Sequence, residues 1–274
     1  MVPVLFTILG SGSGGNCAYL EAGETRLLID AGFSARQIRE RLSSIGRAPE
    51  SLSGILITHE HSDHVQGLSV LAAKTGVPVY CNRLTRDAIL TSNPGTFVSK
   101  LFNTGDSFAV GDVEVETFSI PHDAQDPVGF LLRTGSGNIG FLTDLGHASR
   151  MVVERVRPAH ALVLETNYDL RMLQEDTRRP WSLKQRIASR HGHLSNDAAA
   201  NTLRQIMHDG LQTVYMAHMS RDCNRPELAQ RALSAAVELC GATHVELRPT
   251  SQDKPCATQV LSAVPSPCSN TVPP

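Results

Sequence analysis

The sequence predicts an α/β fold in which two β-sheets pack face to face and helices cover their outer faces. Short apolar runs separated by glycines fill the first thirty residues, and strands then alternate with helices up to about residue 91. A β-rich stretch between Phe97 and Asp144 follows, and further helix–strand units complete the chain. This order of elements is typical of two packed sheets with outer helices. A chain of 274 residues can bury about three quarters of its unfolded surface without disulfides.

The first half is expected to begin with three strands, because apolar runs are separated by glycine-containing turns. These strands are Val4–Leu9, Ala18–Glu21 and Arg26–Asp30. An amphipathic helix should follow, and Ser34 is a suitable residue to cap its first turn. Strands and helices then alternate as helix Ser34–Ser43, strand Gly54–Thr58, helix Gln66–Thr75, strand Val77–Cys81 and helix Arg83–Thr91.

The second half is expected to begin with four strands joined by glycine-rich turns, namely Ser107–Val110, Val113–Ser119, Val128–Arg133 and Asn138–Thr143. Helices Ser149–Arg155, Asn196–His208 and Pro226–Cys240 then alternate with strands Ala161–Glu165, Val214–Ala217 and an edge strand His244–Leu247. Residues from 249 onward are rich in proline, serine and threonine. The sequence therefore predicts one domain over residues 1–248 and a disordered tail over 249–274.

The composition excludes several classes of protein. Hydrophobic residues make up 41% and charged residues 19%, which is ordinary for a globular chain. The net charge of −2 excludes a uniformly basic nucleic-acid coat but permits a local basic patch. The six cysteines form no CxxC pair, which favours a reduced cytoplasm and argues against a cysteine-rich zinc site. The N-terminus lacks the charged start of a signal peptide, and no apolar run approaches ~18 residues, so no membrane partner is expected.

A dense group of ionisable residues, His59-Glu60-His61-Ser62-Asp63-His64, directly follows the apolar strand at 54–58. A strand end is a rigid place from which to gather ligands. Three imidazoles and two carboxylates so close together would repel one another when charged, and a divalent cation turns that repulsion into binding. His59 and His61 can aim at one ion, and Asp63 and His64 at a second. The alternative is a solvated loop.

Three further candidates follow apolar strands elsewhere in the chain: His122, Asp144 and His218. Taken singly, each has an ordinary explanation, since the histidines could be capping or core residues and Asp144 a turn residue. Four strand ends that supply metal-binding side chains are better explained by one common site. The sequence therefore predicts that these three residues converge on the cluster at 59–64.

These residues carry a family resemblance. THEHSDH after an apolar strand, with LLIDAG upstream, resembles the metallo-β-lactamase superfamily, and the match runs over residues 4–247. The motifs GSGSGGNC, LLIDAGFS, PVGF, LVLETNYD, LKQRIASRHGHLSN and MAHMSRDCN resemble the YycJ/WalJ-type branch, which is related to RNase Z and to phosphonate-pathway phosphodiesterases. The resemblance implies the αββα sandwich of that superfamily. No long Gly/Pro-rich arm of the RNase Z kind is present.

The resemblance also implies a dinuclear metal site, with zinc favoured and manganese or iron admitted. The first ion would be held by His59, His61 and His122, the second by Asp63, His64 and His218, and Asp144 would bridge them. A hydroxide between the ions would be the nucleophile, with Asp63 and His193 as catalytic residues. Asp30 and Glu165 are expected to orient ligands from behind. The alternatives are a helix-capping neighbour for His193 and a plain strand-end aspartate for Asp30.

A basic segment lies between Leu170 and His191, with six cations against two acids and the only tryptophan of the chain. Positive charge beside an aromatic ring favours contact with a phosphate backbone and an unpaired base. The expected substrate contacts are Arg178, Arg179, Trp181, Lys184 and Ser220. The alternative is a solvated helix with Trp181 packed in the core.

The resemblance and the basic segment together predict a metal-dependent phosphodiesterase, and within that class an exonuclease on DNA or RNA. One alternative is a small-molecule phosphodiesterase, lactonase or esterase on the same fold. Another is a non-catalytic binding protein, against which the complete ligand set argues. Binding of nucleic acid should weaken steeply with salt, whereas turnover of a small ester should not.

Overall fold

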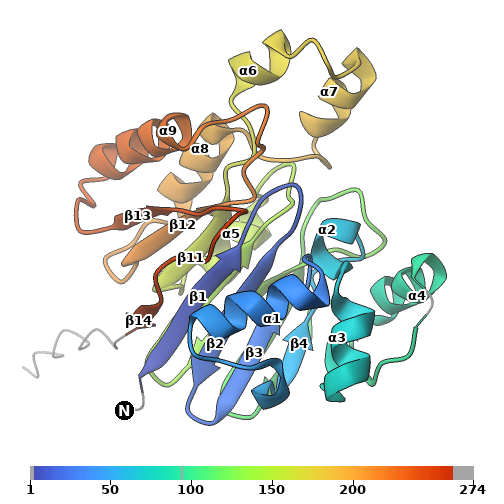
Figure 1. Cartoon of the computed structure of the whole chain (residues 1–274). Coiled ribbons are helices and arrows are strands. Elements are labelled where there is room, and N and C mark those ends of the chain that lie inside the picture. The colour runs from blue at the N-terminus through green and yellow to red at the C-terminus, as the bar shows by residue number, and fades with distance from the viewer. Residues whose placement is uncertain (1–2, 94, 262–274) are drawn as a thin grey trace, which may run out of the picture.

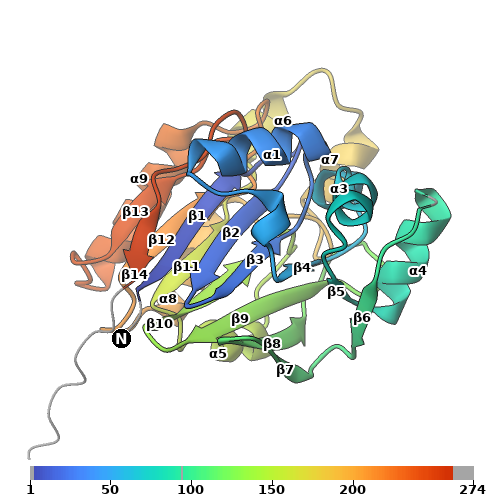
Figure 2. The same ribbon diagram turned by 60° about the horizontal axis from the view of Figure 1, so that its bottom comes forward.

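The computed structural model describes residues 3–93 and 95–261. Two seven-stranded sheets pack against each other, and most of the helices lie on their outer faces (Figure 1). Figure 2 shows α1 and α3 on the outer side of one sheet and α5 beside the other. The expected α/β sandwich of two mixed sheets is confirmed.

The first sheet has the strand order β14-β1-β2-β3-β4-β5-β6. Strands β14 to β3 pair antiparallel and strands β3 to β6 pair parallel. The strands are β1 Val4–Gly10, β2 Cys17–Ala22, β3 Thr25–Ile29, β4 Gly54–Leu56, β5 Val79–Asn82, β6 Ser99–Phe102 and β14 Gln259–Leu261. The helices on this side are α1 Ala35–Ser44, α2 Ser62–Val65, α3 Leu68–Thr75 and α4 Arg83–Ser92, with a 3₁₀ turn at Pro49–Ser51. Ser34 caps α1 through a capping box with Gln37, as its sequence position predicted.

The second sheet has the order β13-β12-β11-β10-β9-β8-β7, antiparallel from β7 to β10 and parallel from β10 to β13. Its strands are β7 Ser107–Val110, β8 Val113–Ser119, β9 Val128–Thr134, β10 Gly137–Leu142, β11 Ala161–Glu165, β12 Thr213–Ala217 and β13 Glu246–Pro249. Its helices are α5 Arg150–Val156, α8 Asn196–Ile206 and α9 Pro226–Leu239. Two further helices, α6 Leu170–Glu175 and α7 Trp181–Ile187, project away from the sheets at the top of Figure 1.

Apolar side chains form three packed layers. Phe6, Phe130 and Tyr215 belong to the layer between the two sheets, and the rings of Phe6 and Tyr215 meet edge to face. Leu71 belongs to the layer under α1 and α3, and Leu233 to the layer under α8 and α9. Each such side chain contributes about 1.5–3 kcal/mol on burial. This packing fixes the strand ends from which the candidate ligands extend.

The C-terminal segment corrects the expected boundary of the tail. Residues 249–261 are not a disordered tail, because they cross from β13 to β14 and β14 pairs antiparallel with β1. Leu261 is buried, and the amide side chain of Gln259 bonds to Tyr215 and Thr213. These contacts are distant in sequence and supply the order that the local composition lacks. Residues 262–274 of the expected tail lie outside the described residues.

Over the described ranges, the structure contains no helix that is both long and apolar enough to cross a membrane.

Candidate metal centre

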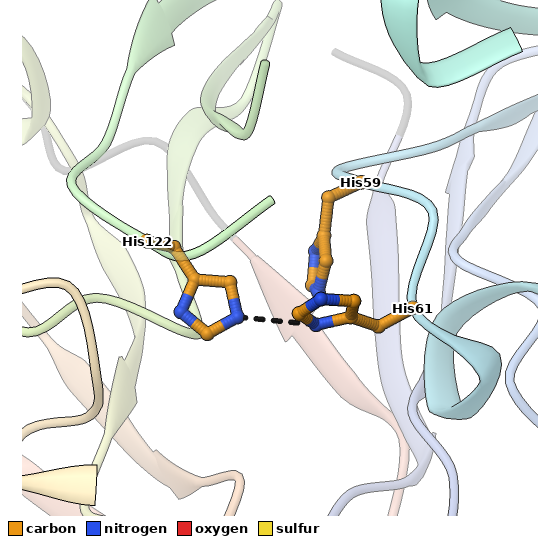
Figure 3. A group of neighbouring side chains, drawn as sticks. All are labelled: His59, His61 and His122. Atoms are coloured by element: carbon orange, nitrogen blue, oxygen red, sulfur yellow. Dashed lines mark hydrogen bonds between the residues drawn. The ribbon is translucent and has the colours of Figure 1, made fainter. Parts of the chain in front are cut away.

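The first group of predicted ligands consists of His59, His61 and His122 (Figure 3). His59 and His61 extend from the loop after β4, and His122 reaches them from the loop after β8. Each ring offers a nitrogen, and these nitrogens all lie within 4.8 Å of one another. Burial lowers the pKa of His59 well below its ordinary value, and neighbouring His64 lowers it further. Burial also lowers the pKa of His122 more than nearby Asp144 raises it. Imidazole nitrogens at this spacing are suited to share a cation.

The second group consists of Asp63, His64, Asp144 and His218. Nε2 of His218 lies 3.3 Å from Oδ2 of Asp63 and 3.3 Å from Oδ1 of Asp144. Burial opposes a charge on His218, but Asp144, Asp63 and Glu165 raise its pKa to about 10. A cation that binds among these carboxylates therefore displaces protons from the rings.

Asp144 lies between the two groups. Its Oδ2 is 3.1 Å from Nε2 of His64 in the second group, and its Oδ1 is 3.9 Å from Nε2 of His122 in the first. Burial opposes ionisation of Asp144, but the charges of His218 and His64 outweigh it and hold the pKa of Asp144 well below its ordinary value. An ionised carboxylate in this position is placed to contact ions in both groups.

Two buried atoms test whether a metal ion fits these residues. Among the described residues, Nε2 of His59 and Oδ2 of Asp144 have no hydrogen-bond partner of good geometry. A buried polar atom without a partner costs about 1–3 kcal/mol. A divalent cation would satisfy both atoms, and the imidazole and carboxylate donors around them are its usual ligands. The two groups therefore fit divalent metal binding.

Asp30 and Glu165 lie behind the candidate ligands. Oδ2 of Asp30 is 2.7 Å from Nδ1 of His64, and Oε1 of Glu165 is 2.8 Å from Nδ1 of both His218 and His193. The other carboxylate oxygen of Glu165 accepts hydrogen bonds from the backbone N–H groups of residues 145 and 194. Both carboxylates are fully buried. Their expected role of orienting ligands is consistent with these contacts and stays a prediction.

The backbone at three of these strand ends is unusual. The non-glycine residues with positive φ among those described are Asp30 (61°), Asp144 (58°) and His218 (51°). They follow β3, β10 and β12. L-residues other than asparagine and aspartate rarely adopt this left-handed conformation, which costs about 1–2 kcal/mol per residue. Such outliers concentrate at functional sites, because surrounding structure must hold them.

His193 lies beside both groups and faces a cavity. Its Nδ1 is 3.6 Å from Oδ1 of Asp144, and its side chain is partly exposed. Burial lowers the pKa of His193, but Glu165 and Asp144 raise it above its ordinary value. The cap of α8 is Ser195, two residues after His193, so the alternative of a capping neighbour stays open and the catalytic role of His193 stays a prediction.

Both ligand groups open onto one cavity of about 230 Å³, which His193 also lines. Three polar lining residues were not among the predicted site residues: Ser13, Asp123 and Arg186. Ser13 belongs to the glycine-rich turn after β1, and that turn was the one local signal for it. Asp123 follows a predicted ligand directly, and Arg186 was one cation among six.

Comparison with known proteins gives the family. Residues 25–219 match the family described as the beta-lactamase superfamily domain. The chain belongs to the beta-lactamase superfamily. Within this superfamily it is 39% identical over 235 residues to exodeoxyribonuclease YycJ of Bacillus anthracis, covering 85% of this chain and 89% of that protein. It is 37% identical over 232 residues to exodeoxyribonuclease WalJ of Streptococcus pneumoniae, covering 83% and 86%. The resemblance to the YycJ/WalJ branch is confirmed.

A solved structure agrees on the superfamily fold. The metallo-beta-lactamase fold protein YhfI of Bacillus subtilis superposes with a TM-score of 0.71, covering 93% of this chain and 99% of that chain at 13% sequence identity. At that identity the likeness concerns the fold alone.

The expected substrate contacts of this superfamily member lie outside the cavity lining. Arg178 and Arg179 are held by Asp176 and Asp222. Lys184 donates to the backbone carbonyl of residue 174. Trp181 is 67% exposed, so the alternative in which it packs in the core is wrong. Ser220 is buried, and its hydroxyl accepts the N–H of residue 223 beside a neighbouring cavity.

Proposed function

We propose that this protein is a metal-dependent exodeoxyribonuclease that hydrolyses phosphodiester bonds at the ends of DNA. The observation that carries the proposal is that both groups of candidate ligands and His193 face one cavity. The names of the two relatives, which match most of this chain at 37% identity or more, supply the substrate class.

The proposed site holds two divalent ions. His59, His61 and His122 would hold one, Asp63, His64 and His218 the other, and Asp144 would contact both. An all-imidazole group suits zinc, whereas the mixed group also suits manganese or iron. When bound, such a pair supplies an activated water and neutralises charge on a phosphoryl oxygen.

His193 is the proposed general acid. The hydrogen bond between its Nδ1 and Glu165 fixes the ring and leaves Nε2 as the atom that can give a proton to the leaving oxygen. Glu165 and Asp144 raise the pKa of His193, which favours retention of that proton. Asp63 has its carboxylate partly open to the cavity and is the second proposed catalytic residue.

We also propose a cytoplasmic location. The five cysteines among the described residues are all unpaired, and three of them are buried. Unpaired thiols are typical of a reducing compartment.

The experiment compares four substrates: end-labelled DNA in single-stranded and duplex form, RNA of the same sequence, and bis(p-nitrophenyl) phosphate. The expected result is release of mononucleotides from DNA, loss of that activity with a chelator, and its return with zinc or manganese. Preference for RNA would show that the substrate is RNA and not DNA. Turnover of the small ester alone, without any effect of added salt, would favour a small-molecule phosphodiesterase and contradict the proposal.

A further inference from the structure

Three carboxylates, four histidines and one arginine line the cavity that the two ligand groups share. The carboxylates are Asp63, Asp123 and Asp144, and Arg186 is the only lysine or arginine among the described lining residues. Bound ions would offset the charge of Asp63 and Asp144, which are proposed metal ligands. Asp123 is a further carboxylate, and it opposes the entry of a negatively charged phosphodiester unless a cation offsets it.

The other cations of the basic segment are engaged elsewhere. Arg178 and Arg179 pair with Asp176 and Asp222, and Arg171 pairs with Glu175 at 2.7 Å. Arg190 contacts the ring of His147. Arg186 differs from these residues because its side chain faces the cavity while remaining 63% exposed.

Neighbouring segments hold the backbone of Arg186 in place. It belongs to the last turn of α7, and the N–H of His193 donates to the carbonyl of Ile187 at 2.8 Å. A Cβ on Gly192 would come within 2.3 Å of the Arg186 carbonyl oxygen, so this end of α7 packs directly on the loop that carries His193. The carbonyl of Gly192 in turn accepts a hydrogen bond from Nδ1 of His122 at 3.1 Å. The backbone that carries Arg186 is therefore fixed relative to the predicted ligands.

Asp123 holds the guanidinium of Arg186 through Nε. Its other oxygen, Oδ1, lies 3.5 Å from Nε2 of His122. An aspartate presents two oxygens in a plane, as a phosphodiester does with its two non-bridging oxygens, and a guanidinium binds either in the same way. The carboxylate of Asp123 thus occupies the contact that a phosphate would use.

We infer that Arg186 exchanges Asp123 for a non-bridging oxygen of the substrate phosphodiester when nucleic acid enters the cavity. This inference rests on the proposed function, and it identifies the side chain that binds the phosphate backbone of the nucleic acid. Arg186 is a substrate-binding residue. Asp123 positions its guanidinium and competes with the phosphate, so a ligand without a comparable anionic group gains nothing from Arg186.

The test measures binding of a fluorescein-labelled single-stranded oligodeoxynucleotide to metal-loaded protein by anisotropy, with the probe checked for cleavage afterwards. Arg186→Gln should weaken binding about tenfold or more, the scale of a hydrogen bond to a charged group. It should also flatten the dependence of log K on log salt by about 0.7. Arg171→Gln removes one positive charge from the same basic segment, but at a position outside the cavity. This control variant should change binding far less.

The direction in which Asp123→Asn changes the oligonucleotide affinity decides between the two explanations. If Asp123 competes with phosphate, this variant should tighten binding several-fold, and the gain should vanish in the Arg186→Gln background. If the ion pair only fastens α7 to the body, both single variants should weaken binding, which would overturn the inference. An oligonucleotide with an uncharged methylphosphonate at its terminal linkage should lose more affinity for the wild type than for Arg186→Gln.

The outcomes separate this inference from the proposed function. If the wild type cleaves DNA but Arg186→Gln and Arg171→Gln bind the oligonucleotide equally well, the inference about Arg186 is overturned and the proposed function stands. A wild-type protein that neither binds nor cleaves DNA or RNA would overturn both.

Discussion

Oδ2 of Asp30 and Nδ1 of His64 lie 2.7 Å apart, and both side chains are fully buried. The contact fixes the proton of the ring on Nδ1 and directs Nε2 toward Asp144. Thr58 braces the same carboxylate through its N–H and its hydroxyl. A carboxylate behind a histidine ligand sets the orientation and basicity of that ligand.

We therefore expect Asp30→Asn to weaken metal binding at the second group by about tenfold, because the amide cannot accept every hydrogen bond that the carboxylate accepts. Asparagine is the appropriate replacement, since the φ of 61° at this position would strain most other residues. Calorimetric titration of zinc into the metal-free protein measures both affinities. Equal affinities in variant and wild type would show that Asp30 has no influence on His64.

His193→Ala should cut turnover on DNA by about two to four orders of magnitude, the scale of general acid–base groups, without changing the metal content. The loss should be smaller on bis(p-nitrophenyl) phosphate, because its leaving group needs less protonation. Turnover on both substrates and metal analysis of the same preparation are the measurements. A fall in metal content would make His193 a ligand, and unchanged turnover would remove the proposed acid.

Trp181 projects from the start of α7 with two thirds of its surface exposed. If a base of the substrate stacks on it, Trp181→Ala should weaken oligonucleotide binding by about 1–3 kcal/mol. The melting temperature should stay unchanged, because no core contact is lost. A lower melting temperature with unchanged binding would instead assign Trp181 a structural role.

His160, which is not one of the candidate ligands, should make the stability of the fold depend on pH. Its Nδ1 accepts the backbone N–H of Asn138 at 3.0 Å, and burial together with nearby His208 lowers its pKa below 6.5. Because folding favours the neutral ring, this contribution is present above the unfolded pKa and is lost as the pH falls through the folded pKa. His160→Asn keeps an acceptor without a titration. Its melting temperature should therefore fall less than that of the wild type between about pH 8 and pH 5; parallel curves would contradict the assignment.

The strand ends that carry the candidate ligands could be predicted because their signal is local. Apolar runs precede His59, Asp144 and His218, and burial of a strand depends mainly on its own side chains. The positive φ of Asp144 and His218 could not be predicted in this way, because contacts on several strands hold it. The ordered segment after residue 249 escaped prediction for a similar reason. The three-residue β14 exists through pairing with β1, about 250 residues away in the chain.

The basic segment shows the same limit of local reasoning. Its charges and the two acids within it, Glu175 and Asp176, were visible in the sequence, but the partners from other parts of the chain were not. Asp222 lies far along the chain from Arg178 and Arg179, and it draws both into ion pairs. Asp123 lies in the loop that carries the predicted ligand His122, and it forms an ion pair with Arg186. Which cation faces the cavity depends on where α7 packs, and composition carries no information about that.

We propose that one carboxylate, Asp144, joins two metal ions into a single centre. The decisive measurement is metal analysis of the purified protein, in parallel with Asp144→Ala. We expect about two divalent ions per wild-type chain, as in other two-metal hydrolytic sites, and a loss from both groups in Asp144→Ala. Retention of the full metal content in that variant, or a wild-type chain that binds no divalent ion, would contradict the account.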